Sequence, residues 1–172
     1  MKYGKVDLGQ VEALLNKIGG EEGMNAILSG RATIAYKEHV IDLDAQPRIP
    51  YDGWTVEEHK KGGQFKWDPK KVALFLSSKQ ESGNIEGNKL RKELADKPVY
   101  NANLLDYLLD NPHLIPEEWK GNAVFFWGTI YRYSDGHLDV RCLIFDGGHW
   151  QQSRNWLNDD FDGTLPAAVA AS

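Results

Sequence analysis

Apolar residues near the N-terminus recur with the period of an α-helix. One stripe follows the i, i+3, i+4, i+7 spacing at Val11, Leu14, Leu15 and Ile18. Asp7 is a candidate N-cap, and Gly19–Gly20 ends this helix before a second stripe of Met24, Ile27 and Leu28. The pattern predicts a helical hairpin as an N-terminal module of residues 1–41, with a strand at 31–36.

The next segment, residues 42–67, has no such periodicity. It is rich in charge and contains the structure-breaking residues Pro47, Pro50, Gly53, Gly62 and Gly63. This composition is typical of a loop. We therefore expect a linker here, between the N-terminal module and a C-terminal α+β domain of residues 68–172.

The C-terminal domain begins with alternating strand and helix signals. Alternation over residues 71–77 predicts a strand, and two leucines spaced four residues apart predict a helix over 86–95. A further helix should begin after a cap at Asn101 or Asn103. It should end at Asn111–Pro112, because proline lacks the backbone donor that a helix needs.

The strongest strand signal lies in residues 123–157. Residues 123–133 are rich in aromatic and β-branched types, and Asp135–Gly136 is a favoured hairpin turn. A second turn at 146–148 leads to a third strand. These features predict a β-meander. The whole chain then reads as an α+β fold, with a helical hairpin followed by helices packed on a three- to five-stranded antiparallel sheet.

A two-residue loop at Asp135–Gly136 would fix the register of the first two meander strands. Arg132 would then lie opposite Asp139 as a cross-strand ion pair. One face would be the core face, with Leu138, Val140, Cys142 and Ile144 next to Trp127, Thr129, Tyr131 and Tyr133. The other face would carry His137, Asp139 and Arg141. Cys142 is then a small core residue rather than a nucleophile.

The third meander strand alternates aromatic and polar residues on one face. These residues are Trp150, Gln152, Arg154 and Trp156. Aromatic rings interleaved with hydrogen-bonding side chains suit a flat ligand or a partner's loop. We therefore consider them a candidate ligand-binding face, together with Arg132, Asp139 and Arg141. The alternative is a pair of tryptophans that covers the core.

Composition narrows the class of protein. The 172 residues are 41% hydrophobic and 26% charged, which is typical of a folded globular chain. A net charge of −5 argues against broad binding to nucleic acid or to an anionic membrane. A single cysteine excludes an intrachain disulfide. No apolar run is long enough for a signal peptide or a membrane span, so we expect a cytoplasmic protein.

Candidate chemistry is sparse, and we expect neither a cofactor nor a metal. Residues 158–163 resemble the start of a calcium loop, but Val169 stands where the last acidic ligand belongs. One alternative function is a small hydrolase that uses His113 or His137 with nearby carboxylates. Another is weak nucleic-acid binding through the basic segment 60–71, although acidic neighbours dilute its charge.

Long stretches of the chain resemble a family of bacterial proteins found mainly in candidate-phylum genomes. The resembling stretches are LRKELADKPVYNANLLDYLLDNPHLIPEEWKG, FFWGTIYRYSDGHLDVR and WLNDDFDGTLPAAVAAS, together with QVEALLNKIGGEEGMNAIL near the start. The family has no assigned activity, so the resemblance implies no catalytic residue. It implies an N-terminal module shared among proteins with different bodies, which favours docking or regulation.

The leading interpretation of the sequence is a non-enzymatic binding or protein-interaction module. Its partner would be a protein or a small molecule rather than a nucleic acid or a membrane. The oligomeric state does not follow from the sequence.

Overall fold

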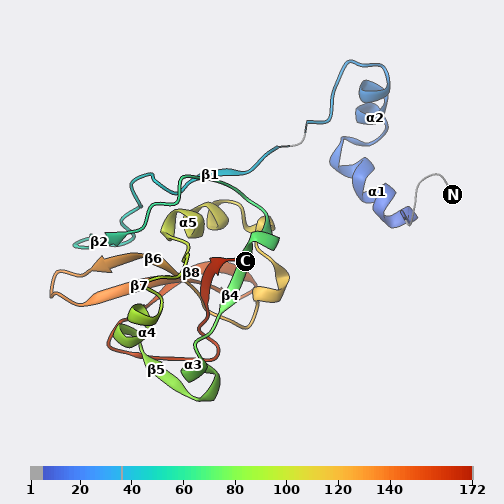
Figure 1. Cartoon of the computed structure of the whole chain (residues 1–172). Coiled ribbons are helices and arrows are strands. Elements are labelled where there is room, and N and C mark those ends of the chain that lie inside the picture. The colour runs from blue at the N-terminus through green and yellow to red at the C-terminus, as the bar shows by residue number, and fades with distance from the viewer. Residues whose placement is uncertain (1–5, 36, 172) are drawn as a thin grey trace. The chain divides into compact units, whose positions relative to one another are not determined.

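The structure is a computed structural model that describes residues 6–35 and 37–171. The chain divides into two compact units, one ending at Glu38 and the other, the body, beginning at His39. Figure 1 traces both, and each unit is described by itself.

The N-terminal unit contains the predicted helical hairpin. Its helices are α1 (Leu8–Lys17) and α2 (Gly20–Leu28). The Asp7 carboxylate accepts the Gln10 N–H at 2.8 Å, and the Gln10 side chain accepts the Asp7 N–H at 3.1 Å, which completes a capping box. No residue of either helix is buried. The predicted strand at 31–36 is wrong over residues 31–35, which pair with no neighbouring strand; Tyr36 lies outside the described residues.

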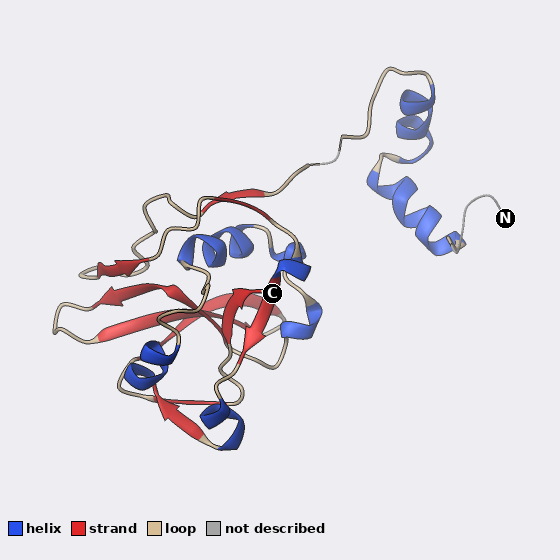
Figure 2. Ribbon diagram, in the orientation of Figure 1, coloured by secondary structure: helices blue, strands red, loops and turns tan. Residues whose placement is uncertain are grey.

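The body is built on a six-stranded sheet (Figure 2). Five strands follow the order β4 (Val72–Phe75), β10 (Ala167–Ala170), β6 (Val124–Arg132), β7 (Leu138–Asp146) and β8 (His149–Trp156). The sixth, β2 (Thr55–His59), also pairs with β6. Only the β10–β6 pair is parallel. The α+β class and the meander are confirmed, whereas the sheet is larger than predicted and mixed in direction.

Two small ribbons and several short helices complete the body. The ribbons pair β1 (Val40–Asp42) with β3 (Gln64–Lys66), and β5 (Asn84–Glu86) with β9 (Asp160–Asp162). The α-helices are α3 (Ser78–Ser82), α4 (Gly87–Glu93) and α5 (Ala102–Asp110). The single 3₁₀ turns are Pro69–Lys71, Pro112–Leu114 and Glu117–Trp119. Asn101 caps α5 as predicted.

The central strands are buried on both faces, between α5 on one side and α4 on the other (Figure 2). On the α5 side, the buried cluster includes Leu104, Leu105, Leu108, Phe126 and Leu143. On the α4 side, it includes Leu90, Leu94, Phe125, Val140 and Cys142. Two-sided burial accounts for the nearly continuous apolar run of β6.

The segment 42–67 is part of the body and not the predicted linker. It contains β2 and β3, and β2 pairs with the last half of β6. The Asn101 amide donates to the carbonyls of Leu43 at 2.7 Å and Lys60 at 2.8 Å. The Lys60 N–H in turn donates to the Gly128 carbonyl at 2.7 Å. These contacts connect residues far apart in the sequence, which composition alone does not reveal.

The β6–β7 register differs from the prediction by one residue. Tyr133 N–H donates to the His137 carbonyl at 2.9 Å, and Gly136 N–H donates to the Tyr133 carbonyl at 3.0 Å. The loop therefore holds three residues rather than two. Gly136, with φ +92°, supplies the left-handed position that such a loop requires.

Because the register differs by one residue, the last residues of β6 share a face with other β7 residues than predicted. Arg132 lies opposite Leu138, and Tyr131 lies opposite Asp139, so the predicted Arg132–Asp139 ion pair is wrong. Arg132 instead forms a two-pronged ion pair with Glu57 of β2, at 2.6 and 2.8 Å. A second irregularity between Phe125 and Ile130 shifts the register again.

We expect Gly128→Ala to destabilise the body by about 1–3 kcal/mol, the usual cost of overpacking a core. A methyl group at this position would lie 2.9 Å from the backbone N and Cα of Asn101. Urea unfolding followed by circular dichroism measures the loss. Gly163→Ala is the matched control: its nearest neighbour would be the Gln80 carbonyl at 3.4 Å, an ordinary contact, and we expect a change within about 0.5 kcal/mol. Equal effects of the two changes would contradict this account.

Candidate functional site

All residues of the predicted binding face except Arg132 lie on one side of the sheet, toward α5. In the β7–β8 register, Asp139 lies opposite Trp156 and Arg141 lies opposite Arg154. Trp150 packs against the core cluster on the α5 side. Arg132 pairs with Leu138 and therefore lies on the other side. The structure thus brings Trp150, Gln152, Arg154 and Trp156 together with Asp139 and Arg141.

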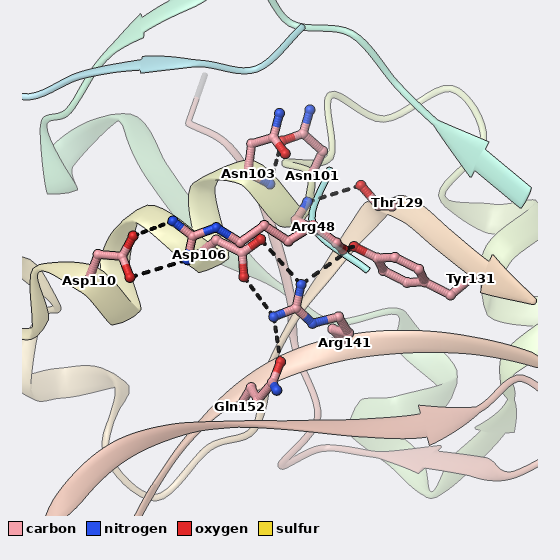
Figure 3. A network of polar contacts seen from close by, with 10 residues as sticks. Arg48, Asn101, Asn103, Asp106, Asp110, Thr129, Tyr131, Arg141 and Gln152 are labelled. Atoms are coloured by element: carbon pink, nitrogen blue, oxygen red, sulfur yellow. Dashed lines mark hydrogen bonds and ion pairs between the residues drawn. The ribbon is translucent and has the colours of Figure 1, made fainter. Parts of the chain in front are cut away.

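The β7 part of this face is interior, because Asp139 and Arg141 are buried, and Figure 3 shows the network around Arg141. The Arg141 side chain is only 3% exposed. Its guanidinium donates to the two oxygens of Asp106 at 2.7 and 3.3 Å, to the Tyr131 hydroxyl at 3.4 Å and to the Gln152 side chain. Burial opposes the Arg141 charge, but the hydrogen bond and charge of Asp106 outweigh it, so the pKa of Arg141 is raised.

The network continues from Tyr131 toward the surface (Figure 3). Burial raises the pKa of Tyr131, whose hydroxyl donates to the Arg48 carbonyl at 3.0 Å. The Arg48 side chain forms an exposed ion pair with Asp110, at 2.5 and 3.2 Å. The two terminal nitrogens of Arg141 are bound within this network, whereas its Nε has no partner among the described residues, and the Arg141–Asp106 contact holds α5 on the sheet. The buried members of this network are structural rather than a surface open to a ligand.

Asp139 is the second buried charge on this face. It is completely buried, and its Oδ1 accepts from Arg154 Nη1 at 2.7 Å. Its Oδ2 has no hydrogen-bond partner within the described residues. Burial raises the pKa of Asp139, and the neighbouring Arg154 opposes that shift only in part. The ion pair therefore joins a buried carboxylate, Asp139, to a partly exposed guanidinium, Arg154.

Within the predicted face, Arg154 and Trp156 are the exposed residues, and Trp150 and Gln152 are half-buried. The Arg154 guanidinium lies 5.4 Å from the Trp54 ring centre and 6.0 Å from that of Trp156. His137 stacks on Trp156 with ring centres 5.1 Å apart. Tyr51 and Tyr133 both contact Trp54 and are about two-fifths exposed, like Trp156. This aromatic cluster depends on the 42–67 segment, which contributes Tyr51 and Trp54.

A larger concavity lies elsewhere, between α4, the end of β2 and β6. Its volume is about 560 Å³, within the range of small-molecule sites. The lining residues are Glu58, Lys60, Asn88, Arg91, Lys92, Leu94, Ala95, Val99 and Trp127. None of them belongs to the predicted ligand-binding face, and only Lys60 belongs to another predicted site, the basic segment 60–71. We call this space the α4 cavity.

The α4 cavity has cationic walls. Lys60, Arg91 and Lys92 face a single carboxylate, Glu58, which forms an ion pair with Arg91 at 2.5 Å. The Lys60 ammonium donates to the Ala95 carbonyl at 2.7 Å, at the residues that follow α4. The Lys92 ammonium has neither a hydrogen bond nor an ion pair within the described part of the chain. The lining therefore carries an excess of positive charge.

The apolar part of the α4 cavity lining includes Trp127, whose indole carries one hydrogen-bond donor. Trp127 is 4% exposed and packs against Phe125 and Phe161. Its indole Nε1 is buried and has no acceptor among the described residues. An indole nitrogen can only donate, and a buried donor without an acceptor costs about 1–3 kcal/mol. A ligand that carries an acceptor would remove that cost.

The two histidines of the alternative hydrolase function lie apart from the α4 cavity. His113 contacts the ring of His39, and His137 lies 2.9 Å from Asp135 at the β6–β7 turn. Cys142 is buried as predicted, and burial raises its pKa to about 12. The described residues contain no cluster of three or more His, Cys, Asp or Glu side chains able to hold a metal ion.

The aromatic residues of the basic segment 60–71 are engaged in the core. Phe65 packs on Tyr100 with ring centres 4.9 Å apart, and Trp67 packs on Trp119 at 6.4 Å. In the calcium-loop stretch, Asp162 accepts from Thr164 at 2.6 and 2.7 Å, and Asp160 accepts from Asn84 at 3.0 Å. The carboxylates of Asp160 and Asp162 are thus held by neighbouring side chains and backbone.

No family model, curated protein or solved structure matches the chain. Among the described helices, none combines the length and the apolar character needed to cross a bilayer.

We expect Arg141→Met to destabilise the body by about 3–5 kcal/mol, because it leaves the buried Asp106 carboxylate without its ionic partner. Urea unfolding measures the loss. The double variant Arg141→Met with Asp106→Leu should recover most of it, because removing both charges also removes their desolvation cost.

The exposed Lys79–Glu93 ion pair, at 2.6 Å, provides the control for this experiment. Lys79→Met should change the free energy of unfolding by no more than about 0.5 kcal/mol. A loss for Arg141→Met as small as that for Lys79→Met would show that the network does not hold α5 on the sheet.

Proposed function

We propose that the protein is a non-enzymatic binding protein whose α4 cavity takes a small anionic molecule with an apolar body. The observation that carries the proposal is the combination of cationic walls with a buried, unpartnered indole donor in the apolar part of the lining. This proposal retains the binding module that the sequence suggests. It places the binding site in the α4 cavity instead of on the third meander strand.

The chemistry of the walls selects the class of ligand. Arg91 and Lys92 on α4 and Lys60 after β2 favour a carboxylate or a phosphate. Leu94, Ala95, Val99 and the Trp127 ring suit a hydrocarbon or an aromatic group. An acceptor atom near the indole Nε1 would fix the orientation. Such a ligand is both charged and apolar.

Binding fits this lining better than catalysis does. The lining includes no His, Cys or Ser, and its one carboxylate, Glu58, is held by Arg91. A general base or a nucleophile needs a group whose electron pair is available to the substrate. The resemblance to bacterial proteins and the single cysteine favour a bacterial cytoplasmic setting for this binding protein.

We expect octanoate to bind the full-length protein more tightly than octylammonium does, in isothermal titration calorimetry at low salt. The two probes share one hydrocarbon chain and differ in the sign of the head group. Attraction to three cations against one anion favours the carboxylate. Equal affinity for both probes, or tighter binding of octylammonium, would contradict the proposal.

Variants of α4 show where octanoate binds. Lys92→Ala should weaken it by about tenfold, since tenfold corresponds to the loss of one charge-assisted contact. Lys89→Ala is the matched control, because Lys89 is an exposed lysine of the same helix, 3.3 Å from Glu86, and does not line the α4 cavity. Equal weakening by both changes would indicate a general charge effect and would contradict binding in the α4 cavity.

A further inference from the structure

The outer edge of the main sheet at β8 is open. β8 is the terminal strand of the sheet, and among the described residues no strand pairs with its outer side. It is in regular register with β7 over all of its residues, from His149 to Trp156. An open edge of this kind presents unpaired backbone donors and acceptors.

The ladder shows which residues present these groups. Leu157 N–H donates to the Leu138 carbonyl at 2.9 Å, so this pair is a hydrogen-bonded pair of the antiparallel ladder. Hydrogen-bonded pairs alternate along such a ladder. The backbone groups that point away from β7 are therefore those of Trp150, Gln152, Arg154 and Trp156. Among them, the Trp156 carbonyl accepts the Asp159 N–H at 3.1 Å.

This edge lacks the devices that usually prevent strand pairing. Natural sheets protect their edges with lysine, proline, bulges or inward-pointing charges. The β8 sequence His-Trp-Gln-Gln-Ser-Arg-Asn-Trp has no lysine and no proline, and its pairing with β7 has no bulge. Its one arginine, Arg154, is bound to Asp139 of the neighbouring strand at 2.7 Å, with its side chain 39% exposed.

We infer that β8 pairs with β8 of a second copy of this chain, antiparallel and centred on Ser153, to form a symmetric dimer. The pairing places Trp150 opposite Trp156 and Gln152 opposite Arg154 across the two-fold axis. Each residue whose backbone groups point away from β7 then lies opposite another such residue, as hydrogen bonding in an antiparallel ladder requires. On the other face, Gln151 lies opposite Asn155.

The strand is complementary to itself in this register. No like charges face each other, whereas centring the pair on Arg154 would oppose two arginines. Centring it on Gln152 would set Trp156 against Gly148, outside the strand, and would shorten the ladder. A two-fold axis normal to the sheet keeps α5 of both copies on the same face, so one sheet continues through the dimer.

Sedimentation equilibrium of the full chain tests this inference. We expect the mass to rise from 19.4 kDa toward twice that value as the concentration increases to about 0.5 mM, a range that detects even weak association. A mass of 19.4 kDa at every concentration would overturn the inference. In that case the open edge either serves a different chain or stays unpaired.

Two charge variants test the register. Gln151→Lys with Asn155→Lys sets lysine opposite lysine at both symmetric positions, and the dissociation constant should rise about tenfold or more. Gln151→Glu with Asn155→Lys changes the same positions but sets glutamate opposite lysine, so the dimer should persist or tighten. Circular dichroism confirms that both variants are folded. A dimer equally stable in both variants would place the contact away from β8 and overturn the inference.

Discussion

The body depends on the close contact between Asn101 and Gly128. The backbone of β6 approaches the first residues of α5 so tightly that position 128 has no room for a methyl group. Asn101 caps α5 there, and its amide group holds the carbonyls of Leu43 and Lys60. One side chain thus joins the helix, the sheet and the 42–67 segment. The wall of the α4 cavity that contains Lys60 is positioned by this junction.

The sheet is covered on both faces, and the buried polar groups have a different role on each face. The face under α5 encloses Arg141 and Asp106, which neutralise each other away from solvent. The face under α4 leaves a cavity in which charges gather at the rim and the donor of Trp127 stays unpartnered. The Arg141 Nε also lacks a partner among the described residues, but it is enclosed by the network, whereas Trp127 lines a cavity, which makes Trp127 the better candidate for contact with a ligand.

Local signals in the sequence predicted local structure well. The Asp7 cap, the Asn101 cap and the meander turns depend on neighbouring residues, and each is present. The register failed because Asp135–Gly136 is equally compatible with a three-residue loop, in which Gly136 adopts the left-handed conformation. One residue in a loop decides which side chains face each other over the strands that follow.

Contacts between residues far apart in the chain could not be predicted from local sequence signals. The strands within 42–67 are short, and β2 gains its place by pairing with β6, some 70 residues later in the chain. Trp127 looks like any core residue in the apolar run of β6, and the sequence does not reveal that it lines a cavity or that its Nε1 has no acceptor among the described residues. The basic residues of α4 read as a solvated helix face. Their functional significance appears only when the α4 cavity is assembled.

The most direct test of the central claim is the indole N–H resonance of Trp127 in a ¹H–¹⁵N correlation spectrum during titration with octanoate. The chain has 6 tryptophans, and Trp127→Phe assigns the resonance by its loss. The account predicts that the Trp127 resonance shifts progressively with octanoate, while the indole resonance of Trp54 stays in place. A Trp127 resonance that does not move as octanoate saturates the protein would contradict it.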